Sequence, residues 1–94
     1  MAPREVEDVL HSFPGVRDAA VVGVPDRLAG EAVHAHVSAD PGVELAAPEI
    51  RRHCAGLLEA HMVPQRVVVH DELPRIGSGK IDRRKLAESS KPAG

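Results

Sequence analysis

The sequence contains almost no aromatic residues: Phe13 is the only one, and tryptophan and tyrosine are absent. Its apolar content of 43% comes mainly from alanine and valine, which bury less surface per residue than aromatic side chains do. With 94 residues, the chain has the length of one small domain. A small domain with so thin a core is marginally stable alone, so docking against a partner would stabilise it.

Cysteine, long apolar runs and an excess of positive charge are lacking as well. Cys54 is the single cysteine, which excludes an internal disulfide and is typical of a reducing compartment; we expect a cytoplasmic location. No run reaches the ~18 apolar residues of a membrane span, and the charged N-terminus does not resemble a signal peptide. The net charge of −2 provides no field that would attract nucleic acid or an anionic membrane. We therefore expect neither as a partner.

Three segments have the pattern of helices. Residues 3–13 place apolar side chains three and four positions apart and end at Pro14-Gly15. A second helix opens at Pro48, and its apolar stripe consists of Ile50, Cys54, Leu57 and Leu58. Asp82 can cap a short third helix that runs through Leu86.

Three segments have the pattern of strands. Residues 19–24 form a continuous apolar run, which predicts a central strand covered on both faces. Residues 30–37 alternate, which predicts a half-exposed strand paired with the first, and residues 66–70 are strongly β-prone. The sequence therefore predicts an α+β fold, a small sheet of about three main strands covered by helices, in the order α-β-β-α-β-loop-α. Residues 89–94 are expected to form a flexible tail.

The loop before the last helix has the composition of an anion-binding segment, Gly77-Ser78-Gly79-Lys80. Glycines permit unusual backbone angles and expose amide groups, and an ammonium stands at the end of the loop. A nucleotide-binding P-loop is excluded, because Pro74 occupies its first glycine position and Ile81 replaces the hydroxyl residue that would hold magnesium. From these four residues alone, an ordinary glycine-rich turn followed by a solvated lysine is the favoured interpretation.

Residues 71–86 resemble the last conserved motif of the adenylate-forming superfamily, written as leucine-proline, a few residues, then [ST/N]-G-K-[IV]-x-R-x-x-L. The matching residues here are Leu73, Pro74, Ser78, Gly79, Lys80, Ile81, Arg83 and Leu86. Residues 2–10 are similar to the end of the motif that follows the hinge of this family, and residues 19–33 are similar to its first two strands. The family includes acyl- and aryl-CoA ligases, adenylation domains of peptide synthetases, and luciferases.

This resemblance implies that residues 1–88 are the small C-terminal lid domain of an ATP-dependent carboxylic acid ligase, which forms an acyl- or aryl-adenylate and then a thioester. It implies that Lys80 is the catalytic residue, reaching the substrate carboxylate and the α-phosphate of ATP, and that Gly77, Ser78 and Gly79 position it. A positioned cation at that point would stabilise the approach of two anions. The resemblance further implies that a large N-terminal domain, in cis or in trans, binds ATP and magnesium, and that CoA or the phosphopantetheine of an acyl carrier protein accepts the acyl group. The isolated chain is then expected to be inactive.

Alternatives to this interpretation concern the whole chain and its histidines. A free-standing accessory domain that binds and completes or regulates a partner enzyme in trans is the other function considered. His34 and His36, with His53, Cys54 or His61, are candidate zinc ligands, but no second closely spaced ligand pair accompanies them, and we predict no metal site. The acid that is activated depends on the large domain, which this sequence does not contain.

Overall fold

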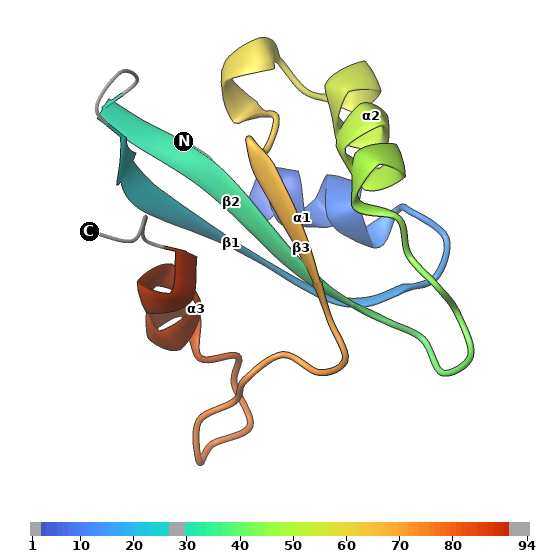
Figure 1. The fold of residues 1–94 in the computed structure, drawn as a ribbon, viewed down its shortest axis with the longest axis vertical. Coiled ribbons are helices and arrows are strands. Elements are labelled where there is room, and N and C mark those ends of the chain that lie inside the picture. Colours follow the sequence, from blue (N-terminus) through green and yellow to red (C-terminus); the bar gives the residue numbers. More distant parts are fainter. Residues whose placement is uncertain (1–2, 27–29, 91–94) are drawn as a thin grey trace.

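The computed structural model describes residues 3–26 and 30–90, and Figure 1 shows their path. The elements in chain order are α1 (Pro3–His11), β1 (Val16–Asp26), β2 (Gly30–Ala39), α2 (Ala47–Leu57), a short 3-10 helix (Ala60–Met62), β3 (Arg66–His70) and α3 (Arg83–Ser90). This α+β order confirms the one predicted from the sequence. Among the described residues, no helix combines the length and the apolar character needed to cross a membrane.

The sheet has three strands in the order β1-β2-β3, so β2 is central. β1 and β2 are antiparallel, with Val21 opposite Ala35, and β2 and β3 are parallel, with Val37 opposite Val69. The parallel pair requires a long crossover between the two strands, and the segment that contains α2 provides it (Figure 1).

Side chains from the two faces of the sheet form two separate apolar clusters. The larger cluster joins the sheet to α1 and α2, and its fully buried members include Val6, Leu10, Ala35, Val37, Ile50 and Cys54. Burial raises the pKa of the Cys54 thiol, which fits its role as a small apolar core residue. The smaller cluster lies on the opposite face, under α3, and its buried members are Ala20, Val22, Leu73 and Leu86. The sheet is therefore covered on both faces, as the sequence predicts.

Two strand assignments from the sequence were wrong. The apolar strand β1 lies at an edge of the sheet, not at its centre, although α1 and α3 still bury its two faces. β2, which was expected to be half-exposed, is the central strand and is buried over most of its length. The alternation was misleading because the polar residues His36 and Ser38 are themselves buried, at 1% and 2% exposure.

The helix assignments hold with smaller corrections. The backbone N–H of Lys85 donates to Asp82 Oδ1 at 3.0 Å, which confirms the predicted cap. Ile50 and Cys54 are buried, but Leu57, the last residue of α2, is 60% exposed. α3 extends to Ser90, so the first two residues of the expected tail are helical. Residues 91–94 of that tail lie outside the described residues.

Candidate functional site

Residues 75–81, called here the Lys80 hairpin, form a small β-hairpin between β3 and α3. Arg75 and Ile81 pair as an antiparallel bridge. The Ile76 N–H donates to the Lys80 carbonyl at 2.9 Å, and the Gly79 N–H donates to the Ile76 carbonyl at 2.9 Å. This pattern is a three-residue hairpin loop whose last position requires a left-handed backbone, and Gly79 has φ +88°. The glycine at that position therefore closes the turn.

The hairpin presents Lys80 to solvent. Lys80 and the three loop residues predicted to position it, Gly77, Ser78 and Gly79, are all exposed. Figure 1 shows this segment, in orange, extending away from the sheet below α3. Within residues 3–26 and 30–90, the Lys80 ammonium has no hydrogen bond or ion pair. The structure thus brings the four predicted site residues together and leaves their cation available to an anion from outside the domain.

Arg75 connects the hairpin to the sheet. Its Nη1 donates to the Gly79 carbonyl at 2.9 Å, and its Nη2 donates to Asp18 Oδ2 on β1 at 2.8 Å. Asp18 also accepts a longer hydrogen bond, of 3.5 Å, from the Ser38 hydroxyl on β2. The Arg75 guanidinium therefore links Gly79, the residue directly before Lys80, to β1 and, through Asp18, to β2.

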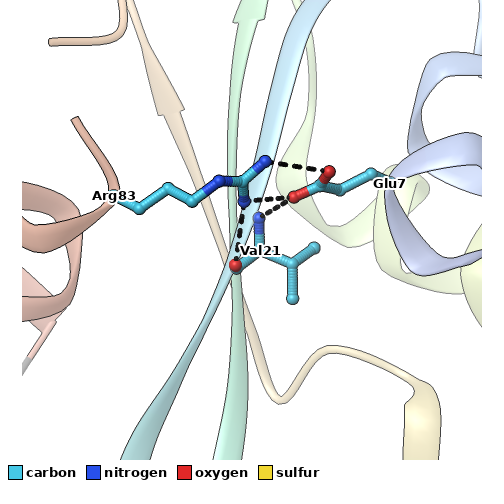
Figure 2. A network of polar contacts seen from close by, with 3 residues as sticks. All are labelled: Glu7, Val21 and Arg83. Atoms are coloured by element: carbon cyan, nitrogen blue, oxygen red, sulfur yellow. Dashed lines mark hydrogen bonds and ion pairs between the residues drawn. The ribbon is translucent and has the colours of Figure 1, made fainter. Parts of the chain in front are cut away.

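A second guanidinium, that of Arg83, contacts the outer edge of β1 at Val21 (Figure 2). Glu7 of α1 accepts a hydrogen bond of 2.9 Å from the Val21 N–H, and Arg83 of α3 donates to the Val21 carbonyl at 3.3 Å. Arg83 and Glu7 also form a two-pronged ion pair through both carboxylate oxygens. The hydrogen bonds with Glu7 raise the pKa of Arg83, although desolvation acts in the opposite direction. This Glu7–Arg83 clamp satisfies the N–H and the carbonyl of Val21 at the strand edge, and it fixes α3 at the end of the hairpin.

The sequence model of one protein family, the AMP-binding enzyme C-terminal domain, matches residues 5–80 of this chain. That match runs from α1 to the exposed lysine of the hairpin. The chain belongs to this family. The family is the small C-terminal domain of adenylate-forming enzymes, so the resemblance noted in residues 71–86 is confirmed.

Relatives of this AMP-binding enzyme C-terminal domain are much longer proteins. It is 38% identical over 88 residues to the putative acyl-CoA synthetase YngI of Bacillus subtilis, a match that covers 94% of this chain and 16% of YngI. It is 42% identical over 86 residues to the fatty acid–[acyl-carrier-protein] ligase ScoC of Streptomyces coeruleorubidus, covering 92% of this chain and 17% of ScoC. The chain thus spans about a sixth of the length of these relatives.

Solved structures contain the same fold. The domain superimposes on apo MatB from Rhodopseudomonas palustris with a TM-score of 0.88 and 34% identity, covering 95% of this chain and 18% of MatB. It superimposes on the amide bond synthetase McbA from Marinactinospora thermotolerans with a TM-score of 0.88 and 38% identity, covering 96% of this chain and 18% of McbA.

The structure also contains a pair of histidines that the sequence did not predict, of which His36 is buried and His70 is partly buried. His36 Nδ1 and His70 Nε2 lie 2.8 Å apart, joining β2 to β3. Desolvation, followed by the proximity of His70, His34 and Arg66, lowers the pKa of His36 to about 4. Desolvation also lowers the pKa of His70. The pair is therefore neutral at pH 7.

The zinc alternative considered from the sequence finds no support in this geometry. In the two described segments of the chain, no three histidine, cysteine or acidic side chains lie close enough to hold a metal ion. His53 is instead within hydrogen-bonding distance of Ser12, at 2.8 Å, and its ring contacts Phe13 edge-on. Cys54 is enclosed in the core.

Proposed function

We propose that this domain supplies Lys80 to the adenylation step of an ATP-dependent carboxylic acid ligase. The observation that carries the proposal is the hairpin, which holds an exposed ammonium at its end in a domain of the adenylate-forming family. An ammonium on a flexible four-carbon stem is suited to an anionic reacting centre. The large adenylating domain, bound in cis or in trans, would complete the site; we call the two together the assembled enzyme.

In the proposed reaction, a carboxylate oxygen of the acid attacks the α-phosphorus of ATP. The new bond joins that oxygen to phosphorus, the bond to the β-phosphate oxygen breaks, and pyrophosphate leaves with the electron pair. A positioned cation stabilises this step because it offsets charge where two anions converge. In a second step a thiol attacks the acyl carbonyl and gives up its proton, the bond from the acyl carbon to the AMP oxygen breaks, AMP leaves with the electron pair, and a thioester forms.

The proposal divides the remaining binding between the two domains. Lys80 suits a phosphate or carboxylate group, but the described residues offer no cluster of acidic ligands for magnesium, so we assign magnesium and most contacts to ATP to the large domain. Relatives named as CoA ligases and as a ligase of an acyl carrier protein support CoA or carrier-borne phosphopantetheine as the acceptor. Because relatives carry this domain within one longer chain, we favour the same arrangement here over an accessory domain acting in trans.

The test compares the two half-reactions in the assembled enzyme. Lys80→Ala should slow acid-dependent exchange of pyrophosphate into ATP by on the order of 10² or more, as expected for the loss of one preorganised charge contact. Thioester formation from supplied acyl-adenylate should be retained. Lys80→Arg should restore little exchange, because a planar guanidinium needs a different geometry.

Two controls accompany the Lys80 variants. Lys85→Ala removes a neighbouring exposed lysine on α3 and should change neither half-reaction. The isolated chain should form no acyl-adenylate. Equal loss of both half-reactions in Lys80→Ala would refute the proposal and indicate a structural role for Lys80.

A further inference from the structure

Arg75 contacts the backbone directly before the lysine. Its Nη1 donates to the Gly79 carbonyl at 2.9 Å. The peptide unit is planar, so the Gly79 carbonyl and the Lys80 nitrogen lie in the same plane. Fixing that carbonyl fixes the orientation of the peptide from which the Lys80 side chain projects.

The hairpin needs such an anchor. An isolated two-stranded hairpin is marginally stable in water, and the loop of the Lys80 hairpin contains two glycines, Gly77 and Gly79, whose backbones have the largest freedom to lose. The second prong of Arg75 reaches Asp18 at 2.8 Å, and Asp18 belongs to β1 in the sheet. The Arg75 guanidinium therefore holds the turn in a fixed position relative to the sheet.

The contribution of this contact to folding should be small. The Arg75 and Asp18 side chains are 38% and 26% exposed, and ion pairs at such sites contribute little to stability because water and salt screen them. The rate of adenylation should depend much more strongly on this contact, since misplacing a reacting group by about 1 Å can cost on the order of 10²-fold in rate. The two effects can thus be separated by experiment.

We infer that Arg75, braced by Asp18, is a positioning residue that sets the direction of Lys80 for adenylation. This inference rests on the proposed function. Both prongs are required, because one nitrogen must hold the Gly79 carbonyl while another holds the Asp18 carboxylate. Lysine at position 75 keeps the charge but has a single nitrogen, which does not reproduce the fork of a guanidinium.

The first measurement is the effect of Arg75→Ala and Arg75→Lys on both half-reactions of the assembled enzyme. Each variant should slow acid-dependent pyrophosphate exchange about tenfold or more through kcat, with little change in the KM for ATP. Thioester formation from supplied acyl-adenylate should be unchanged. Arg84→Ala is the matched control, since Arg84 is an exposed arginine on α3 whose nearest carboxylate, at 3.7 Å, is Glu88 on the same helix.

The deciding measurement repeats Arg75→Ala in the Lys80→Ala background, under single-turnover conditions. If Arg75 acts through Lys80, the second substitution should slow adenylation no further. Three outcomes would each overturn the inference. Arg75→Ala could slow adenylation about tenfold in both backgrounds, Arg75→Lys could retain full adenylation activity, or the Arg75 variants could lose thioester formation in parallel with adenylation. If the Lys80→Ala variant adenylates as fast as the native enzyme, the proposed function is refuted. If Lys80→Ala is slow but Arg75→Ala is fully active, only the positioning role of Arg75 is refuted.

Discussion

The buried His36, in contact with His70, should make the stability of the domain sensitive to mild acid. In the unfolded chain, His36 has the ordinary pKa of 6.5, whereas in the folded domain its pKa is lowered to about 4. Between these values the unfolded state binds a proton that the folded state excludes, so lowering the pH favours unfolding. The loss of stability should begin near pH 6.5 and be complete near pH 4. The pKa of His70 is lowered as well, so its effect has the same sign.

The size of this effect follows from the difference between the two pKa values. About 2.5 pH units, at about 1.4 kcal/mol per unit, correspond to about 3 kcal/mol for His36 alone. By pH 5 the loss should reach about 2 kcal/mol, before most carboxylates titrate. Because small domains are stabilised by only about 5–15 kcal/mol in total, a loss of this size is readily measured.

The assay is urea unfolding of the chain at pH 7, 6 and 5, followed by circular dichroism because the sequence has no tryptophan. His36→Asn retains a polar group beside His70 and should remove most of the loss between pH 7 and 5. His61→Asn, whose side chain is 68% exposed in the native protein, should retain it. A free energy of unfolding that is constant over this range, or that falls equally in His36→Asn, would refute the reasoning.

Two further predictions concern backbone geometry and the strand edge. Gly79→Ala should slow adenylation about tenfold, because alanine at φ +88° costs about 1–2 kcal/mol. Gly56→Ala on α2, where an added Cβ also meets only open space and φ is not positive, should have little effect, and equal activity of the two variants would contradict the prediction. Glu7→Ala should lower the free energy of unfolding, measured in urea, by about 1–3 kcal/mol, because the Val21 N–H and the Arg83 guanidinium lose their acceptor. The control is Glu5→Ala, since Glu5 is an exposed acid in the same helix. An equal change in both variants would argue against the clamp.

The order of elements and the place of the lysine could be predicted because their signals are local. Apolar spacing in residues 3–13 and 48–58 gave two helices, and the β-prone run in residues 66–70 gave the third strand with its observed bounds. The motif in residues 71–86 located Lys80, since its residues are close together in the sequence.

The position of each strand in the sheet and the contacts that brace the site could not be predicted, because they join distant residues. The clamp on β1 pairs Glu7 with Arg83, 76 positions apart, and the brace of the hairpin pairs Asp18 with Arg75, 57 positions apart. His36 looked exposed because an imidazole is polar, and only the parallel pairing of β2 with β3 brings it to His70. No local pattern specifies that register.

The clamp on β1 also bears on the synthesis of the chain. Glu7 leaves the ribosome long before Arg83 does, so the nascent β1 and β2 can pair while the outer edge of β1 still lacks its guanidinium. An uncovered strand edge is a template for pairing with other chains, and the exposure lasts until the last helix emerges. Products that stop before Arg83 would keep that edge uncovered and would also lack Leu86 of the smaller apolar cluster, and we expect them to aggregate through β1.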